Sequence, residues 1–222
     1  LTKADLEQVK RLYLSGNQLT DVSALVGLIQ LKALNLNSNE LTDDQLTLLA
    51  RLKQLKELNL KGNQITDVSA LAQLTELSKL WLGHNQITDV SALVGLKKLK
   101  VLYLGNNELT DDQLKHLAGL SELRVLSLYH NMLTDDQLKH LVGLTQLTSL
   151  DLTHNQFTDV SDLVAVSKLS ELRLDNNLLT NLSPLAGLKQ LKELTLYNNP
   201  NLTEAEIAKL QKALPKCKIL HD

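Results

Sequence analysis

The sequence is poor in cysteine, proline and aromatic residues. Its 222 residues include one Cys, three Pro, one Trp, one Phe and four Tyr. The single Cys217 excludes an internal disulfide and any cysteine-rich metal site. No apolar run approaches the roughly 18 residues of a membrane helix. A net charge of −2 provides no basic field for nucleic acid or anionic lipid.

The chain begins at Leu1 rather than at Met, and its first residues do not read as a signal peptide. We therefore expect a trimmed or mature fragment. In such a fragment the lack of a targeting signal carries no information about location.

One short sequence motif recurs throughout the chain. The segment Leu77 to Asn85, LSKLWLGHN, has the form L-x-x-L-x-L-x-x-N. The motif occurs nine times, and its closing asparagines are Asn17, Asn39, Asn63, Asn85, Asn107, Asn131, Asn155, Asn177 and Asn199. Successive asparagines are 22 or 24 residues apart. This sequence motif and its repeat period resemble those of leucine-rich repeats.

The repeat predicts an α/β fold in one domain over 1–222. No single unit can bury its own leucines, so neighbouring coils must stack. We expect a right-handed solenoid, a horseshoe with a parallel concave β-sheet of about ten strands. Short α and 3₁₀ helices and turns should cover its convex side. The expected parts are a helical cap at 1–8, nine repeat strands at 9–199, and a capping helix and strand at 200–222.

The two repeat lengths predict different convex segments. The 22-residue form, as in ITDVSAL at 87–93, suits a turn or one tight 3₁₀ turn. The 24-residue form reads LTDDQL, in which Thr42-x-x-Gln45 matches a capping box. We therefore predict three short α-helices, at 43–51, 111–118 and 135–142. A further capping box, Thr203-x-x-Glu206, predicts the C-terminal helix.

The nine repeated asparagines have two interpretations, a ladder of ligand-binding amides or a structural ladder. A binding residue has no reason to recur at every level of a stack. We therefore predict that each asparagine turns inward and bonds backbone groups freed where the strand bends.

The wording NQITDVSALxxLxxLxxLxL resembles the internalin-like class of bacterial leucine-rich repeats, which also includes phosphatase-regulator-like repeats of eukaryotes. The resemblance implies a horseshoe that binds protein partners through its concave face. It favours an extracellular or cell-surface bacterial location and leaves a cytoplasmic one open.

The residues that flank the inner leucines of each strand should face the concave side. All four tyrosines and the only tryptophan fall in this set, whereas Phe157 takes a core position. Trp81, Tyr103 and Tyr129 belong to three consecutive strands. Exposed central aromatics are the usual anchors of protein interfaces. The alternative is that large rings shield a flat parallel sheet.

Other concave positions complete the predicted partner-binding set, which is Trp81, Tyr103, Tyr129, Val101, Val125, Lys79, His84, His130, Asp151 and Arg173. His84, His130 and His154 each precede a repeat asparagine. A zinc site there would have only two ligands on adjacent coils, so we predict polar edge residues and no metal. Four acids, Asp151, Glu171, Asp175 and Glu193, would attract a basic strip on a partner.

No nucleophile–base pair, phosphate-binding glycine loop or metal-ligand spacing is evident, so we expect neither an enzyme nor a cofactor. We predict a monomeric interaction module that binds a protein or peptide, with no nucleic acid and no membrane insertion. The alternative is a scaffold without a partner of its own, either a spacer segment of a larger bacterial surface protein or an engineered repeat protein.

Overall fold

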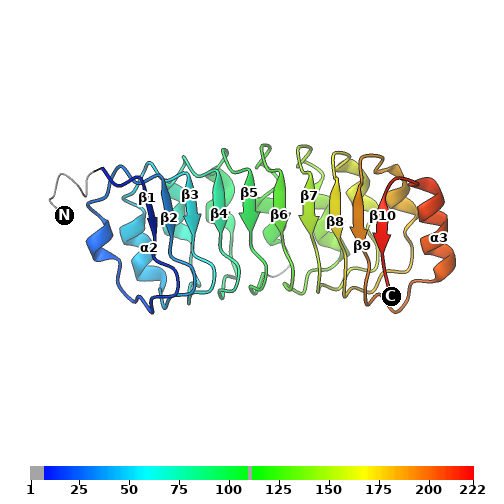
Figure 1. Cartoon of the computed structure of the whole chain (residues 1–222), viewed down its shortest axis with the longest axis horizontal. Helices are drawn as coiled ribbons and strands as arrows, with labels where there is room; N and C mark the ends of the chain where they lie inside the picture. The colour runs from blue at the N-terminus through cyan, green and yellow to red at the C-terminus, as the bar shows by residue number, and fades with distance from the viewer. Residues whose placement is uncertain (1–7, 110–111) are drawn as a thin grey trace.

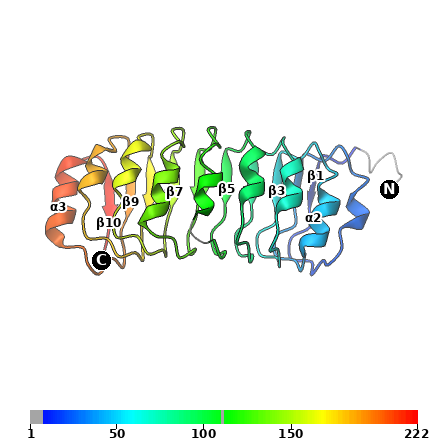
Figure 2. The same cartoon turned by 180° about the vertical axis from the view of Figure 1, so that it is seen from behind.

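A computed structural model describes residues 8–109 and 112–222. Ten three-residue strands lie side by side along the molecule in their sequence order, all parallel (Figure 1). They are β1 Arg11–Tyr13, β2 Ala33–Asn35, β3 Glu57–Asn59, β4 Lys79–Trp81, β5 Val101–Tyr103, β6 Val125–Ser127, β7 Ser149–Asp151, β8 Glu171–Arg173, β9 Glu193–Thr195 and β10 Lys218–Leu220. The helical segments cover the opposite, convex side (Figure 2). This is the predicted solenoid.

Most convex segments are 3₁₀ helices, as the 22-residue repeats predict. They are η1 Ser23–Leu25, η2 Ser69–Gln73, η3 Ser91–Gly95, η4 Gln113–His116, η5 Asp135–Leu141, η6 Ser161–Ala165 and η7 Ser183–Gly187. The α-helices are α2 Asp43–Leu49 and α3 Glu204–Ala213. In Figure 1, α3 lies at the end of the stack beyond β10.

Of the three α-helices predicted in the 24-residue repeats, one is confirmed. The helix predicted at 43–51 is α2, but those predicted at 111–118 and 135–142 are the 3₁₀ helices η4 and η5. Residues 110–111 lie outside the described chain, and Asp112 has a left-handed φ of 71° before η4. All three segments begin with Asp-Asp-Gln-Leu, so this shared sequence does not by itself decide between an α-helix and a 3₁₀ helix.

The core is a continuous column of leucines between the two sides. Leu80, Leu102 and Leu126 stand in register on neighbouring strands and are almost wholly buried. Phe157 is also fully buried, as predicted. The hydrophobic effect contributes roughly 1.5–3 kcal/mol for each such side chain. No described unit could bury its leucines without its neighbours.

The asparagine ladder is structural, as predicted. The Nδ2 of Asn85 donates to the carbonyl oxygens of Leu82 and Leu60, at 2.9 and 3.0 Å. Its Oδ1 accepts from the N–H of Ile65 at 3.1 Å. The amide therefore links its own turn to the preceding coil. Asn17 is the exception, because its side chain is exposed and, among residues 8–109 and 112–222, donates only to the carbonyl oxygen of Ser15.

The predicted capping box of Thr42 and Gln45 is wrong. Thr42 makes no capping hydrogen bond, and Gln45 reaches sideways so that its Oε1 accepts from the N–H of Val22 at 3.0 Å. Asp43 reaches the other way and accepts from the N–H groups of Thr66 and Asp67, at 2.8 and 3.0 Å. Stacking decides these contacts, since the neighbouring coils offer backbone donors that an isolated helix would not meet.

The two ends of the chain differ in what the structure describes. The predicted N-terminal cap at 1–8 lies almost entirely outside the described residues. At the other end, Thr203 Oγ1 accepts from the N–H of Glu206 at 3.3 Å and begins α3, as the sequence predicts. Cys217 is buried between α3 and β10, and burial raises the pKa of its thiol.

Candidate functional site

Two central strands present large aromatic rings on the concave face. Trp81 and Tyr103 are partners in the register of β4 and β5. Leu80 and Leu102 beside them are fully buried. Strand side chains alternate between faces, so the two rings point away from the core.

The two rings form a stack. Their centroids are 6.2 Å apart and their planes differ by 8°. Both side chains are half-buried. A flat, rigid pair of this kind offers contact area with little side-chain entropy left to lose on binding.

Tyr129 does not extend this stack, which corrects the expectation of one three-ring cluster. Ser127, not Tyr129, is in register with Tyr103. Tyr129 lies two residues further along and crosses Gly105, where an added Cβ would stand 2.0 Å from the tyrosine Cδ1. Its hydroxyl makes a short hydrogen bond with the Nε2 of His84. The centre of the face thus holds two aromatic pairs in adjacent rows.

The surroundings of His84 and Tyr129 shift the pKa of each side chain in the direction that favours its uncharged form. Burial, aided by the charges of Lys61 and His130, lowers the pKa of His84 below its ordinary value. Burial and the charge of Asp151 raise the pKa of Tyr129. The Tyr129–His84 hydrogen bond therefore joins two uncharged groups near neutral pH.

Beside the Trp81–Tyr103 stack runs a row of side chains from β4, β5 and β6. The row is apolar at Val101 and Val125 and charged at Lys79. Val101 pairs with Val125 on one side and with Lys79 on the other, and all three are half-buried. The Nζ of Lys79 lies 3.1 Å from the Oε1 of Glu57. The predicted contact residues Lys79, Val101 and Val125 thus form one strip next to the rings.

A small pocket adjoins Trp81 toward the N-terminus, and no sequence pattern predicts it. It has a volume of about 220 Å³ and its lining is Tyr13, Ala33, Leu34, Asn35, Glu57, Asn59 and Trp81. The small Ala33 between larger neighbours makes the hollow. Only the register of four strands brings Tyr13 and Trp81 to its two sides.

The C-terminal part of the face is acidic, and two of its four acids, Asp151 and Asp175, accept hydrogen bonds from backbone N–H groups. Asp151 and Arg173 are cross-strand neighbours. Asp151 also accepts from the N–H of Thr153 at 3.1 Å, and Asp175 accepts from the N–H of Tyr197 at 2.8 Å. These bonds fix the carboxylates at the surface and leave part of their charge open to solvent.

The three aligned histidines have different surroundings at the rim of the sheet. His84 is engaged by Tyr129, whereas His130 and His154 face each other with ring centroids 5.9 Å apart. Together with Met132 they line a pocket of about 230 Å³. The sequence does not predict Met132 as a site residue, because a single Met belongs neither to the leucine motif nor to a zinc-ligand pattern.

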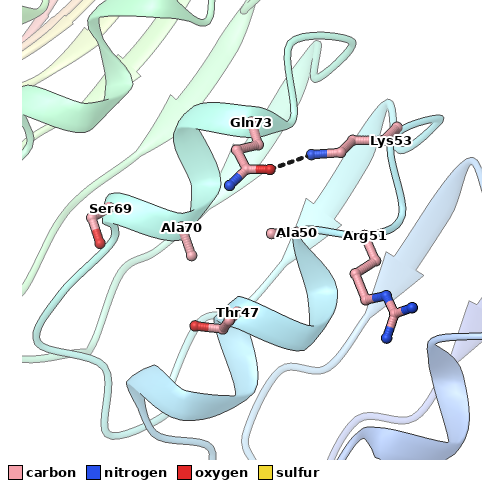
Figure 3. Close-up of a pocket in the computed structure, with 7 residues that line it drawn as sticks. All are labelled: Thr47, Ala50, Arg51, Lys53, Ser69, Ala70 and Gln73. Carbon is pink, nitrogen blue, oxygen red and sulfur yellow. Dashed lines mark hydrogen bonds between the residues drawn. The ribbon is translucent and has the colours of Figure 1, made fainter.

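A hollow on the convex side shows no arrangement for catalysis. It lies between α2 and η2, has a volume of about 350 Å³, and is lined by Thr47, Ala50, Arg51, Lys53, Ser69, Ala70 and Gln73 (Figure 3). The Lys53 Nζ donates to the Gln73 Oε1 at 2.5 Å across it. Its lining contains no carboxylate or imidazole that could serve as a general base.

Within residues 8–109 and 112–222, no helix is both long and apolar enough to cross a bilayer. Nor do three or more His, Cys, Asp or Glu side chains gather there in a group that could hold a metal ion.

Comparison with known families identifies the class of the protein. Two family descriptions match the chain: "Leucine Rich repeats (2 copies)" at 7–51, 53–94 and 75–118, and "Leucine rich repeat" at 97–157. Together these matches span more than half of the sequence. The chain belongs to the leucine-rich-repeat family.

Similar solved structures indicate which type of leucine-rich-repeat protein this chain is. Internalin C2 of Listeria monocytogenes is 38% identical, with a TM-score of 0.82 over 88% of this chain and 84% of its own. A leucine-rich-repeat protein of Leptospira interrogans is 32% identical, with a TM-score of 0.80 over 97% of this chain and 62% of its own. No curated protein sequence matches significantly. The chain is a leucine-rich-repeat protein of the internalin-like type.

A more distant structure shares the fold alone. A plant peptide hormone receptor, solved in complex with RGF2, is 21% identical, with a TM-score of 0.73 over 96% of this chain and 36% of its own. At that identity the likeness concerns the repeat architecture.

Proposed function

We propose that this protein is a non-catalytic interaction module that binds a protein or peptide on its concave face. The observation that carries the proposal is the parallel stack of Trp81 and Tyr103 at the centre of that face. Leucine-rich-repeat proteins are generally protein-interaction modules, which supports the class of function.

The stack is the proposed anchor because it is rigid, apolar and partly open to solvent. Truncating a central aromatic at an interface typically costs 2 kcal/mol or more of binding free energy, roughly a 30-fold loss of affinity. Val101 and Val125 extend the apolar area, and Lys79 adds a charge at its edge. The pocket between Tyr13 and Trp81 is large enough for one side chain of the partner.

Charge along the face would orient the partner. Arg11, Lys61 and Lys79 lie toward the N-terminal strands, with Glu57 among them, while Asp151, Glu171, Asp175 and Glu193 lie toward the C-terminal strands. A partner with a basic segment at one end would associate faster when that end lies over β7 to β9. His84, His130 and Tyr129 form the adjoining rim of the proposed surface.

A peptide library displayed on phage and selected against the folded protein tests the proposal. We expect enriched peptides whose binding weakens at least 30-fold in the double variant Trp81→Ala, Tyr103→Ala. Tyr197→Ala is the matched control, because Tyr197 is an exposed tyrosine at the far end of the same face. Failure to enrich peptides would favour a scaffold without a partner. Binding that the double variant leaves unchanged would place the contact elsewhere.

A further inference from the structure

The rim of the sheet holds the only methionine of the chain beside two imidazoles. Met132 is 66% exposed and lines one pocket together with His130 and His154. The same pocket is completed by Asn155, Gln156 and Asn176. Two adjacent coils thus bring one thioether and two ring nitrogens to one opening, which sequence spacing alone did not indicate.

Met132 departs from the repeat pattern where it stands. The residue after the repeat asparagine is glutamine in four other coils, at Gln18, Gln64, Gln86 and Gln156. An exposed methionine gains nothing from burial there. Its sulfur is a soft, polarisable donor, of the kind that favours monovalent copper over harder cations.

The two imidazoles are free to act as ligands. Neither His130 nor His154 makes a side-chain hydrogen bond within 8–109 and 112–222, whereas the Nε2 of His84 is engaged by Tyr129. Their spacing also fits. Two rings that share an ion about 2.0 Å from one nitrogen of each would have centroids roughly 6 Å apart at most. The observed separation is 5.9 Å.

We propose that His130, His154 and Met132 form a binding site for one monovalent copper ion. Two imidazole nitrogens and one thioether sulfur supply three ligands, a set suited to that ion. The objection raised by the sequence, that two histidines are too few, falls away once the sulfur is counted. This inference does not depend on the proposed partner binding, because it concerns a metal ion and is tested without a partner.

Cys217 is the other soft donor of the chain, and the structure separates it from this site. It is 4% exposed, near β10, and burial raises the pKa of its thiol. A protonated, buried thiol is a poor competitor for the ion. The variant Cys217→Ala nevertheless serves as a control that any binding measured is not at this sulfur.

The test is a titration of the whole protein with silver(I), an air-stable probe for the same ligands, followed by NMR. Because the chain has one methionine, a ¹³C-methyl-methionine label gives a single signal, from Met132. We expect this signal and the ring signals of His130 and His154 to shift and to saturate at one equivalent. Copper(I) under anaerobic conditions should give the same stoichiometry.

The repeats themselves supply conservative variants. Met132→Gln restores the residue of the other coils, and Gln18 already adopts a φ of 54° against 55° for Met132. His154→Asn introduces the residue found at the equivalent Asn176, which shares the positive φ. We expect each to weaken silver(I) binding at least tenfold. His84→Asn is the matched control and should leave the affinity unchanged.

Three results would overturn the proposal. A Met132 methyl signal that does not move in several-fold excess silver(I) would exclude the sulfur. Equal affinity in Met132→Gln would do the same. Zinc(II) binding at this site as tight as copper(I) binding, and insensitive to Met132→Gln, would instead define a histidine-only site. Circular dichroism of each variant checks that the fold persists.

Discussion

The ring of Tyr129 lies across Gly105, so close that a Cβ at residue 105 would stand 2.0 Å from the tyrosine Cδ1. The absence of a side chain at Gly105 therefore lets Tyr129 reach His84 on the next strand but one. Gly105 is not needed for its backbone conformation, because its φ is outside the left-handed range. Its role is to leave room.

This relationship predicts the effect of Gly105→Ala. The added methyl should force Tyr129 into another rotamer, break its bond to His84 and destabilise the fold by about 1–3 kcal/mol. Loss of the covering ring should also raise the pKa of His84 toward its ordinary value. Urea unfolding and an NMR titration of the His84 ring measure the two effects. Gly95→Ala, where an added Cβ meets nothing within 4 Å, is the control.

The asparagine ladder predicts a contrast between two identical residues. Asn85→Ala would leave the buried N–H of Ile65 without its side-chain acceptor. The carbonyls of Leu60 and Leu82 would each lose one of two amide donors and keep those of Asn63 and Asn107. We expect a loss of about 1–3 kcal/mol of unfolding free energy, which is the cost of one unsatisfied buried group. Asn17→Ala removes an exposed amide, so its cost should stay below about 1 kcal/mol. Similar costs for both would contradict a structural ladder.

The hydrogen bonds that Asp43 accepts from the next coil predict that Asp43 contributes more to the free energy of unfolding than Asp44 does. Asp43→Ala removes the acceptor for the N–H groups of Thr66 and Asp67 on the next coil. Since these bonds are partly exposed, we expect a loss of about 1–2 kcal/mol. Asp44→Ala removes a neighbouring charge of the same helix turn and should cost less. Thermal or urea unfolding of the two variants compares them, and equal losses would assign the effect to the helix charge instead.

The same carboxylate predicts a dependence of stability on pH. Partial burial raises the pKa of Asp43, but hydrogen bonds from Thr66 and Asp67 outweigh it and hold the pKa below its ordinary 3.8. A depressed folded-state pKa adds stability that is present above the unfolded-state pKa and is lost as pH falls through the folded value. The difference in unfolding free energy between wild type and Asp43→Asn should therefore shrink below about pH 4. A difference that stays constant from pH 7 to pH 3 would contradict this.

The order of the coils could be predicted from the sequence because one motif recurs. Each Leu-x-x-Leu-x-Leu-x-x-Asn requires the same strand and bend, and a period of 22 or 24 residues leaves parallel stacking as the only way to bury every leucine. The concave placement of Trp81 and Tyr103 follows from strand alternation around Leu80 and Leu102. These features depend only on neighbours within one repeat.

Contacts between coils were decided by tertiary structure. Gln45 accepts from a backbone N–H on the preceding coil instead of taking its expected capping role, and Asp43 accepts from a backbone N–H on the following coil. Tyr129 turns across Gly105 instead of joining the stack. Met132 meets His130 and His154 only because two coils end side by side. The sequence by itself determined the coil and the face on which its rings lie. Which side chains meet across that face depends on register and on the space that small residues leave, and both exist only once the coils are stacked.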